Sequence, residues 1–557
     1  MTGSPHTHQP PRTTTVRGVC WRAAAILALG LILYLPWLGT GGLAFSEGHR
    51  VIPADELRHA DQRPPEVGGR SVWITTLFGR PYLRKPPGTP WAIAASTWAC
   101  EHLPAPIRPS PEFGARLPSA LATIAGAMAV FFVARALFPT RADRAAFYAA
   151  ALHLTLPVFW EGARTAEIEG LHTGATAVAV ALLIATLAAR SRRAAIPLGI
   201  GAGLAISVAM LAKGPAALPV FLATIPAGAL ARWSLERQRA SLDTVPMTRN
   251  HGLRFALAIP LIGSALALWW IGRQVAGLGV PPVLQSPSEF LWSPDRAGRI
   301  AALLPTAVAF GLPATLALWM PWGRAISTGA QETPDHARAA FAARAAALTL
   351  VIALLTYTAI GVHNPRYAIP AITPITLVVA FGAWGYATGA FTGFRQRLTW
   401  HAGARAWATW PTILALGMIA YIALYEQPRR ATSGRSAAAP LASAIAGWSD
   451  GRPVRVYADH AIEARPELLW YAVREINARG GSASARWTDA DGLADAIRSG
   501  HLALIRTDDA SNEQSHLEET HRLRLHTHHQ TQVDRFTFAL VQRAPKPPQT
   551  TSPLPPP

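Results

Sequence analysis

Apolar residues in this chain gather in long runs that carry almost no charge. Each run is about 17 to 23 residues long, the length with which an α-helix crosses roughly 30 Å of hydrocarbon. Eleven such runs lie near residues 22–39, 115–137, 145–160, 171–189, 196–212, 215–231, 255–272, 300–321, 345–362, 367–388 and 408–426. The pattern therefore predicts a polytopic α-helical membrane protein with about eleven transmembrane helices.

The composition agrees with a membrane protein. The 557 residues are 50% hydrophobic, and the mean hydropathy is +0.20, so the chain is too long and too apolar for one ordinary soluble domain. The first run follows Arg12, Arg17 and Arg22 and resembles a secretory signal, but it is long and further runs follow it. We interpret it as a signal anchor.

The basic residues indicate which side of the membrane each loop faces. A formal net charge of +19 would suggest a nucleic-acid partner in a soluble protein. Here, however, the segments on one side of the predicted spans hold twenty Lys and Arg residues, and the short loops on the other side hold six. Because cytoplasmic loops carry the excess of positive charge, we expect membrane lipids rather than nucleic acid as neighbours.

The same asymmetry predicts the topology. It places the N-terminus in the cytoplasm and places both the loop 41–115 and the C-terminal segment outside it. Cys20 and Cys100 would then lie on opposite faces of the membrane and cannot pair with each other.

The segments outside the spans differ in character. Residues 1–16 and the Pro-rich 544–557 are expected to be disordered tails. Residues 17–426 are expected to form the transmembrane domain, with 41–115 as its first extracytoplasmic loop. Residues 427–543 are expected to form a soluble extracytoplasmic α/β domain, with strands at 454–458, 501–506 and 536–542 and helices at 466–478 and 489–498.

A histidine-rich stretch within the α/β domain permits two interpretations. Its members are His521, His526, His528 and His529, and histidines spaced by two or three residues can share a metal ion. The alternative is a solvated surface segment, which we favour because no cysteine and no paired carboxylates accompany them.

Two acids and a base follow directly on the first apolar run. Asp55, Glu56 and Arg58 lie close together in a short polar stretch. Adjacent carboxylates beside a membrane are more often solvated than functional, so a functional interpretation needs support from elsewhere in the loop.

That support is a cationic segment later in the same loop. Arg80, Arg84 and Lys85 lie close to prolines that stiffen the backbone, and fixed cations at a membrane surface suit a phosphate group. The chain has only three lysines against 48 arginines, and two of them, Lys85 and Lys213, lie beside predicted spans. We infer that these two supply a compact ammonium that a forked guanidinium cannot replace.

Six motifs stand in a fixed order along residues 20–425. They are Asp55-Glu56-x-Arg58, Gly79-x-Pro81-Tyr82-Leu83-x-Lys85-Pro86-Pro87, Arg116-x-Pro118-Ser119-Ala120, Arg164-Thr165-Ala166-Glu167-Ile168-Glu169, Leu211-Ala212-Lys213-Gly214-Pro215 and Asn364-Pro365-Arg366-Tyr367-Ala368-Ile369-Pro370. Through these motifs the chain resembles the lipid-carrier-dependent glycosyltransferases of the GT-C class. That class includes the aminoarabinose transferases that modify lipid A and the protein O-mannosyltransferases.

The resemblance implies an activity and a catalytic residue. It implies transfer of a sugar from a polyprenyl-phosphate carrier, with inversion at the sugar carbon, to a lipid, glycan or protein acceptor on the non-cytoplasmic face. The acid that follows the first span in the class corresponds to Asp55, the expected general base. Glu169 matches the second acidic position of the class, with Glu167 as its alternative, and Glu56 is a further catalytic candidate.

The remaining candidates are expected to bind the substrate. Lys85 is the expected main ligand of the donor phosphate, and Arg58 is either the local partner of Asp55 or a second phosphate contact. Arg84 departs from the class, whose members often carry an acid there, which weakens any assignment of aminoarabinose specificity. The other candidates are Tyr82, Glu167, Lys213, Arg366 and Tyr367.

Several of these residues also have a purely structural interpretation. Glu169 could be a helix N-terminal acid that complements the helix dipole. Lys213 could extend to the membrane interface, and Arg366 could be an interfacial anchor. No cofactor is implied with certainty, and the class leaves a divalent metal open without identifying its ligands.

Two other functions compete with the glycosyltransferase. A transporter or flippase of a lipid-linked or anionic solute would also have many spans and few buried charges, but transport sites lie near the midplane, whereas the ionisable residues here gather at one face. A membrane scaffold would leave the motif-rich loop unused. In the glycosyltransferase hypothesis the C-terminal domain covers the active-site cavity or guides the acceptor.

Overall fold

The computed structural model describes most of the chain. The described residues are 16–62, 71–82, 85–138, 142–240, 334–362, 364–388, 409–431, 434–459, 464–508, 513–533 and 536–544, with isolated positions between 259 and 303. The chain divides into two compact units. We call Met1–Leu38, Arg84–Ala92 and Arg116–Ile422 the helical unit, and Gly39–Leu83, Ile93–Ala115 and Ala423–Pro557 the mixed unit.

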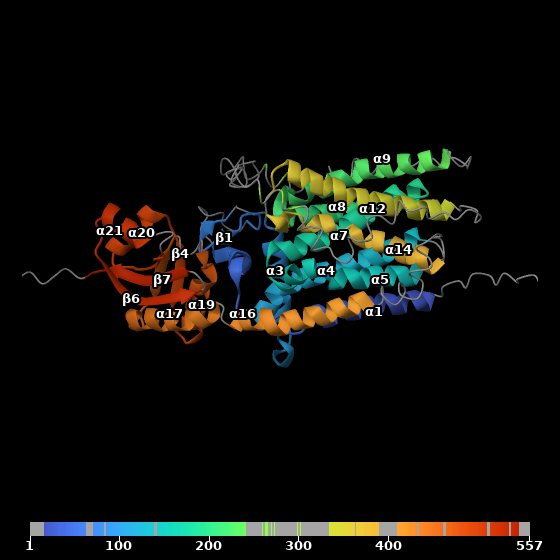
Figure 1. The fold of residues 1–557 in the computed structure, drawn as a ribbon. Coiled ribbons are helices and arrows are strands. Elements are labelled where there is room, and N and C mark those ends of the chain that lie inside the picture. The colour runs from blue at the N-terminus through green and yellow to red at the C-terminus, as the bar shows by residue number, and fades with distance from the viewer. Residues whose placement is uncertain are drawn as a thin grey trace, which may run out of the picture. The chain divides into compact units, whose positions relative to one another are not determined.

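Long helices that run side by side make up the helical unit (Figure 1). In it, α7 packs on α8, α12 packs on α9, and α5 packs on both α1 and α14. The helices are α1 (Val16–Tyr34), α4 (Pro111–Leu137), α5 (Ala142–Thr155), α6 (Pro157–Arg164), α7 (Ile168–Leu187), α8 (Arg192–Lys213), α9 (Leu218–Ala240), α12 (Pro334–Ala359), α13 (Ile369–Ile372) and α14 (Ile375–Thr388).

Several of these helices could cross a membrane. In the described part of the chain, six are long and apolar enough: Arg17–Tyr34, Pro111–Leu137, Ile168–Leu187, Arg192–Arg237, His336–Ala359 and Thr409–Ala431. Ile369–Gly385 is a shorter apolar helix. The predicted spans 255–272 and 300–321 lie largely outside the described residues, so the number eleven stays a prediction.

One predicted span was wrong as a single helix. The apolar run 145–160 is divided between α5 and α6, because Pro157 begins α6 and cannot continue the hydrogen bonding of α5. Leu156, the residue before this proline, is extended, with φ −65° and ψ 126°, as the proline ring requires.

Two glycines bring α7 close to its neighbours. A Cβ atom added to Gly170 would lie 2.1 Å from the carbonyl oxygen of Gly162 and 2.5 Å from Cβ of Ser119. One turn later, a Cβ atom added to Gly174 would lie 2.4 Å from the carbonyl oxygen of Ala122. Small residues at this spacing allow helix backbones to approach where lipid supplies no hydrophobic driving force.

Two buried arginines donate hydrogen bonds to carbonyl groups at the end of α1 and in the residues that follow it. Arg164 donates to the carbonyl oxygens of Tyr34 (2.9 Å) and Pro36 (3.0 Å), and Arg116 donates to that of Leu38 (3.0 Å). Both arginines are fully buried. Because the last carbonyls of a helix have no partner within it, these two motif residues have a structural role.

A five-stranded sheet forms the C-terminal part of the mixed unit. Its strands are β3 (Val454–Ala458), β4 (Ala483–Trp487), β5 (Leu502–Arg506), β6 (Leu525–Val533) and β7 (Phe536–Arg543), in the order β4-β3-β5-β7-β6. Strand β3 is parallel to β4 and β5, and β7 is antiparallel to β5 and β6. The parallel strands explain why helices must connect β3 to β4 and β4 to β5.

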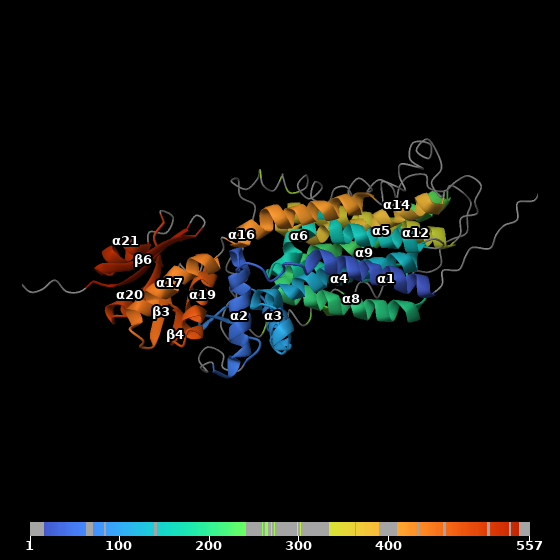
Figure 2. The ribbon, with the colours of Figure 1, turned by 90° about the horizontal axis from the view of Figure 1, so that it is seen from below.

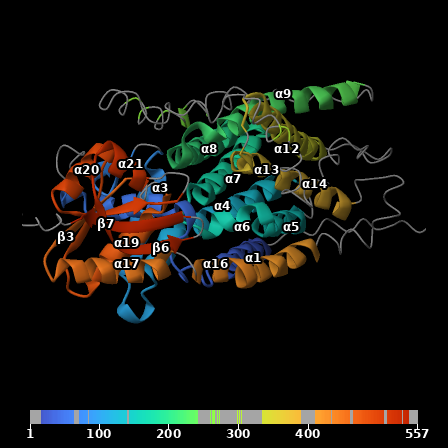
Figure 3. The ribbon, with the colours of Figure 1, turned by 60° about the vertical axis from the view of Figure 1, so that its left-hand side comes forward.

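Helices cover both faces of this sheet. On one face α17 (Gly434–Ser449) lies beside α19 (Pro466–Ala478), as Figure 2 shows. The other face carries α20 (Ala490–Arg498) and α21 (Glu513–Thr520) (Figures 1 and 3). The segment is thus of the α/β type.

Most of the first loop belongs to the mixed unit, whereas its segment Arg84–Ala92 belongs to the helical unit. Its helix α2 (Gly48–Arg58) packs on α19, where a Cβ atom at Gly48 would lie 3.0 Å from Cγ of Pro466. This division differs from the expected domain 17–426, which joined the loop to the spans, because the loop packs tightly against the C-terminal segment.

The histidine-rich stretch lies largely on an edge strand. His526, His528 and His529 belong to β6, the outermost strand of the sheet. Among the described residues, no group of three or more His, Cys, Asp or Glu side chains is placed to hold a metal ion.

Candidate functional site

Helix α2 carries Asp55 on its last turns. Pro53 lies within the helix and has no backbone N–H to donate to the carbonyl oxygen of His49. The guanidinium of Arg50 donates a hydrogen bond to that oxygen instead, at 3.0 Å. The Asp55 side chain is 25% exposed. Its Oδ2 accepts hydrogen bonds from Nε1 of Trp470 (3.2 Å) and from the guanidinium of Arg474 (3.4 Å).

Arg58 is the local partner of Asp55, one of the two roles expected for it. Its guanidinium lies 4.0 Å from Oδ1 of Asp55. The same guanidinium binds the Glu101 carboxylate with both of its terminal nitrogens, one of them at 2.9 Å. Because a bidentate contact with a carboxylate fixes the plane of a guanidinium group, Glu101 positions Arg58 beside Asp55.

A small cavity of about 10 Å³ lies beside Asp55 and Arg58. It is lined by charged and polar side chains, Asp55, Arg58, Glu101, Trp470 and Arg474 among them. All of these residues belong to the mixed unit.

Glu56 holds the hairpin formed by β1 (Thr76–Leu77) and β2 (Arg80–Pro81). Its carboxylate accepts hydrogen bonds from the hydroxyl of Thr76 and from the backbone of Gly79. The two turn residues, Phe78 and Gly79, have φ of 49° and 75°, as a tight hairpin with the twist of its strands requires. The structure thus gives this catalytic candidate a structural task in the loop.

The tyrosine of the cationic segment is buried. Tyr82 accepts a hydrogen bond from the guanidinium of Arg50 at 3.1 Å, and its carbonyl accepts one from the hydroxyl of Thr75 at 2.7 Å. In this conformation Tyr82 supports the loop.

The three cations of that segment have different surroundings. Arg80 lies over the ring of Trp487, with 4.9 Å between Cζ and the ring centroid. Lys85 is half-buried and belongs to the helical unit, whereas Arg84 lies outside the described residues.

A buried ion pair joins two helix ends in the helical unit. Nζ of Lys213, at the end of α8, lies 3.0 Å from Oε1 of Glu169, in the first turn of α7. The Lys213 side chain is 3% exposed and that of Glu169 is 15% exposed. The same ammonium lies 4.4 Å from the ring centroid of Tyr367, which adds a cation–π contact.

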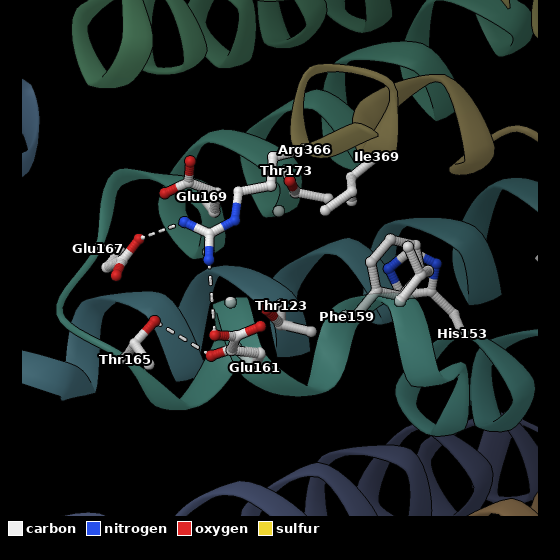
Figure 4. A pocket seen from close by; sticks show the side chains of 14 residues that line it. Thr123, His153, Phe159, Glu161, Thr165, Glu167, Glu169, Thr173, Arg366 and Ile369 are labelled. Carbon is white, nitrogen blue, oxygen red and sulfur yellow. Dashed lines mark hydrogen bonds and ion pairs between the residues drawn. The ribbon is translucent and has the colours of Figure 1, made fainter. Parts of the chain in front are cut away.

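Beside this pair, Arg366 points into a pocket between two further carboxylates, as Figure 4 shows. Its guanidinium lies 3.5 Å from Glu167 and 3.8 Å from Glu161. Burial disfavours the charged guanidinium, but the carboxylates of Glu167, Glu161 and Glu169 outweigh burial and raise the pKa of Arg366 above its ordinary value. Arg366 therefore stays charged.

The pocket around Arg366 has a volume of about 60 Å³, enough for a few water molecules. Its polar lining consists mainly of Thr123, His153, Glu161, Thr165, Glu167, Glu169, Thr173 and Arg366. Carboxylates and a cation side by side can bind a ligand that has both hydroxyl groups and negative charge.

The predicted site residues thus form two clusters. Asp55 and Arg58 meet in the mixed unit, and Glu167, Glu169, Lys213, Arg366 and Tyr367 meet in the helical unit. Sequence reasoning did not identify Glu101, Glu161, Trp470 or Arg474. The only signal for the last two is their spacing of four residues on one amphipathic helix.

The chain was compared with known proteins. The family model described as dolichyl-phosphate-mannose-protein mannosyltransferase matches residues 84–262. No curated protein sequence matches the chain.

Solved structures share its fold along almost the whole length. ArnT from Cupriavidus metallidurans bound to undecaprenyl phosphate matches with a TM-score of 0.61 at 14% identity, over 94% of this chain and 98% of ArnT. The same protein in the apo state matches with a TM-score of 0.61 at 15% identity, over the same shares. These matches agree with the resemblance that the six motifs indicated, and the chain is a multi-pass membrane protein with the fold of ArnT.

Proposed function

We propose that this protein is a membrane glycosyltransferase that moves a sugar from a polyprenyl-phosphate carrier to an acceptor hydroxyl. The observation that carries the proposal is Asp55, a partly exposed carboxylate whose Oδ2 is fixed by N–H donors. It lies in the loop where the resemblance places the catalytic acid. The fold shared with ArnT, a protein solved with undecaprenyl phosphate, supports a carrier of that chemical class.

The proposed reaction is a single displacement at the anomeric carbon. The acceptor oxygen forms a bond to this carbon as the bond from the carbon to the carrier phosphate breaks, so the sugar configuration inverts. The electron pair leaves with the phosphate, and the proton of the acceptor hydroxyl passes to Asp55. General base catalysis of this kind contributes roughly 10²–10⁴-fold to the rate.

Cations stabilise the negative charge that grows on the departing phosphate. Lys85, one of only three lysines in the chain, is half-buried and is the proposed main ligand of this phosphate. Arg58 is held rigidly by Glu101, which suits a group that orients Asp55 more than one that follows a substrate.

In this proposal the Arg366 cluster binds substrate. Lys213 and Arg366 can contact phosphate or sugar oxygens, whereas Glu167 and Glu169 can accept hydrogen bonds from sugar hydroxyl groups. The positive-inside distribution supports a reaction on the non-cytoplasmic face of a bacterial cytoplasmic membrane.

The test is to identify the product. Lipids and surface proteins from cells with and without the gene are compared by mass spectrometry, and the deletion is complemented with wild type or with Asp55→Asn. We expect a species heavier by one sugar that wild type restores and Asp55→Asn does not, at equal protein in the membrane.

Two results would contradict the proposal. If the deletion changes no glycosylated species but redistributes a lipid-linked sugar across the membrane, the protein is a flippase. Full restoration by Asp55→Asn would remove Asp55 from the mechanism.

A further inference from the structure

One face of α19 reaches the candidate base. Trp470 and Arg474 are four residues apart on this helix, so their side chains project from the same face. Both contact the same oxygen, Oδ2 of Asp55, at 3.2 Å and 3.4 Å. These residues lie more than 400 positions apart in sequence but within the mixed unit.

The two donors support each other. Cζ of Arg474 lies 4.6 Å from the ring centroid of Trp470, a cation–π arrangement that restricts both side chains. Trp470 is 7% exposed, so its indole has little freedom to turn away from the carboxylate.

The neighbouring residue fixes α19 to the first loop at two other points. The Tyr471 hydroxyl accepts a hydrogen bond from the backbone N–H of Leu43 (2.8 Å) and donates one to the Glu112 carboxylate (2.9 Å). Tyr471 and Glu112 are both buried. Since several contacts join α19 to the loop, the helix holds its donors at a constant place relative to α2.

A fixed Oδ2 orients the whole carboxylate. An aspartate side chain rotates freely about its last bond unless an oxygen is held, and a base must present one oxygen to the proton that it accepts. With Oδ2 held by Trp470 and Arg474, Oδ1 is the oxygen left on the side of Arg58.

We propose that Trp470 and Arg474 are positioning residues that hold Oδ2 of Asp55 and leave Oδ1 to accept the acceptor proton. This inference rests on the proposed function. It gives the C-terminal segment a role in the chemical step, in place of covering a cavity or guiding the acceptor.

The experiment removes each donor and keeps an aromatic side chain at 470 and a polar side chain at 474. Purified protein in lipid nanodiscs receives an extract of cells that lack the gene, which supplies both the carrier-linked sugar and the unmodified acceptor. The initial rate of transfer is measured for wild type, Asp55→Asn, Trp470→Phe, Arg474→Gln and Arg474→Lys. Binding of undecaprenyl phosphate and the thermal unfolding midpoint are measured in parallel. Undecaprenyl phosphate is the probe of donor binding, and its binding can be measured without the acceptor.

Matched controls exist in the same unit. Trp487→Phe removes an indole N–H bond of the same length, 3.2 Å, to the carboxylate of Asp459. Arg479→Gln removes an arginine that pairs with Glu475 on the same helix. Both controls should keep the wild-type rate.

We expect Trp470→Phe to lower the rate roughly tenfold or more, the factor for one hydrogen bond to a charged group. Arg474 is 45% exposed, so Arg474→Gln should lower the rate only about threefold, and Arg474→Lys should restore most of it. Carrier binding should stay within about twofold of wild type, because the carboxylate acts on the acceptor.

The outcomes separate this inference from the proposed function. If Asp55→Asn is inactive while Trp470→Phe and Arg474→Gln keep the wild-type rate, the positioning role is overturned and the function stands. If Asp55→Asn is active, the proposed mechanism fails first. Should Trp470→Phe unfold, the exposed Arg474 decides: a wild-type rate in Arg474→Gln overturns the inference.

Discussion

Asp55 in the mixed unit and Glu169 in the helical unit both belong to the six motifs of the sequence, but their surroundings differ. Glu169 lies 3.0 Å from an ammonium that is 3% exposed, so its charge is neutralised within the fold. Asp55 is 25% exposed, and its nearest cations are Arg474 at 3.4 Å and Arg58 at 4.0 Å, the latter already bound to Glu101.

This difference indicates that Asp55 can act as a base, whereas Glu169 has a structural charge. A carboxylate that forms a close buried ion pair cannot take up a proton without leaving an unpaired cation. Asp55 is instead 25% exposed, and its ion pair with Arg474, which is 45% exposed, is open to solvent. Of the two acids, Asp55 is therefore the better suited to proton transfer.

The largest expected effect is the contrast between Asp55→Asn and Glu169→Gln in the transfer assay. Loss of a general base should lower the rate by roughly 10²–10⁴-fold, whereas Glu169→Gln should lower it about tenfold or less. Asp61→Asn, an exposed acid of the same loop, serves as the control. Equal losses in folded Asp55 and Glu169 variants would contradict this comparison and show that the reaction needs both acids to the same degree.

The next effect concerns stability in the helical unit. Lys213→Met leaves Glu169 without its ammonium, and breaking such a buried pair costs about 3 kcal/mol. We expect a lower thermal unfolding midpoint in detergent, measured by intrinsic fluorescence, and partial recovery in the double variant with Glu169→Gln.

A matched surface pair calibrates this result. Arg232→Gln breaks an i,i+4 pair with Glu236, and it should change the midpoint little because surface pairs contribute little. If the double variant is as unstable as Lys213→Met alone, the two charges do not act as a pair.

A smaller effect should follow pH in the mixed unit. Burial raises the pKa of Glu467 to about 7 although Arg465 beside it opposes the shift. The carboxyl is protonated in both states below its ordinary pKa of 4.5, so this contribution to stability is complete at low pH. It is lost as pH rises through about 7, by up to about 3 kcal/mol.

The check is the unfolding midpoint between pH 5 and pH 8. The wild-type midpoint should fall more over this range than that of Glu467→Gln, which cannot ionise. Glu475→Gln, which removes a half-buried acid on the same helix, should leave the slope unchanged. Parallel slopes in wild type and Glu467→Gln would show that the buried carboxyl does not control the pH dependence.

The smallest predicted effect tests the inference from lysine scarcity. Lys85→Ala should weaken binding of undecaprenyl phosphate about tenfold, and Lys85→Arg should weaken it a few-fold, because a guanidinium does not replace a compact ammonium. Binding is measured by titration in nanodiscs, with Lys546→Arg as the control. A silent Lys85→Arg would show that the inference is wrong.

Regular elements with a clear apolar period were predicted from the sequence. The strand Val454–Ala458 and the helix Pro466–Ala478 have the bounds that their patterns indicated. Strand β6 was missed because it lies at the sheet edge and is polar along much of its length, so its histidines suggested a surface segment or a metal site. Edge strands do not need an apolar face.

In the candidate site, too, only contacts between residues close in sequence could be predicted. The contact between Asp55 and Arg58 is local, three residues apart, and was predictable. The pair of Lys213 with Glu169 and the bond from Trp470 to Asp55 join residues 44 and 415 positions apart. Sequence periodicity cannot predict such contacts, because they depend on how separate helices pack.

The glycines of α7 bear on how this protein could be adapted to new ligands. Gly170 and Gly174 leave no space for a Cβ atom against α4 and α6, so main-chain contacts set that wall of the Arg366 pocket. Side chains such as Thr123 and Thr173 line the pocket without setting the distance between the helices. Substitutions at the lining positions can therefore change which ligand fits while the bundle keeps its shape, which makes this pocket a favourable starting point for redesigning specificity.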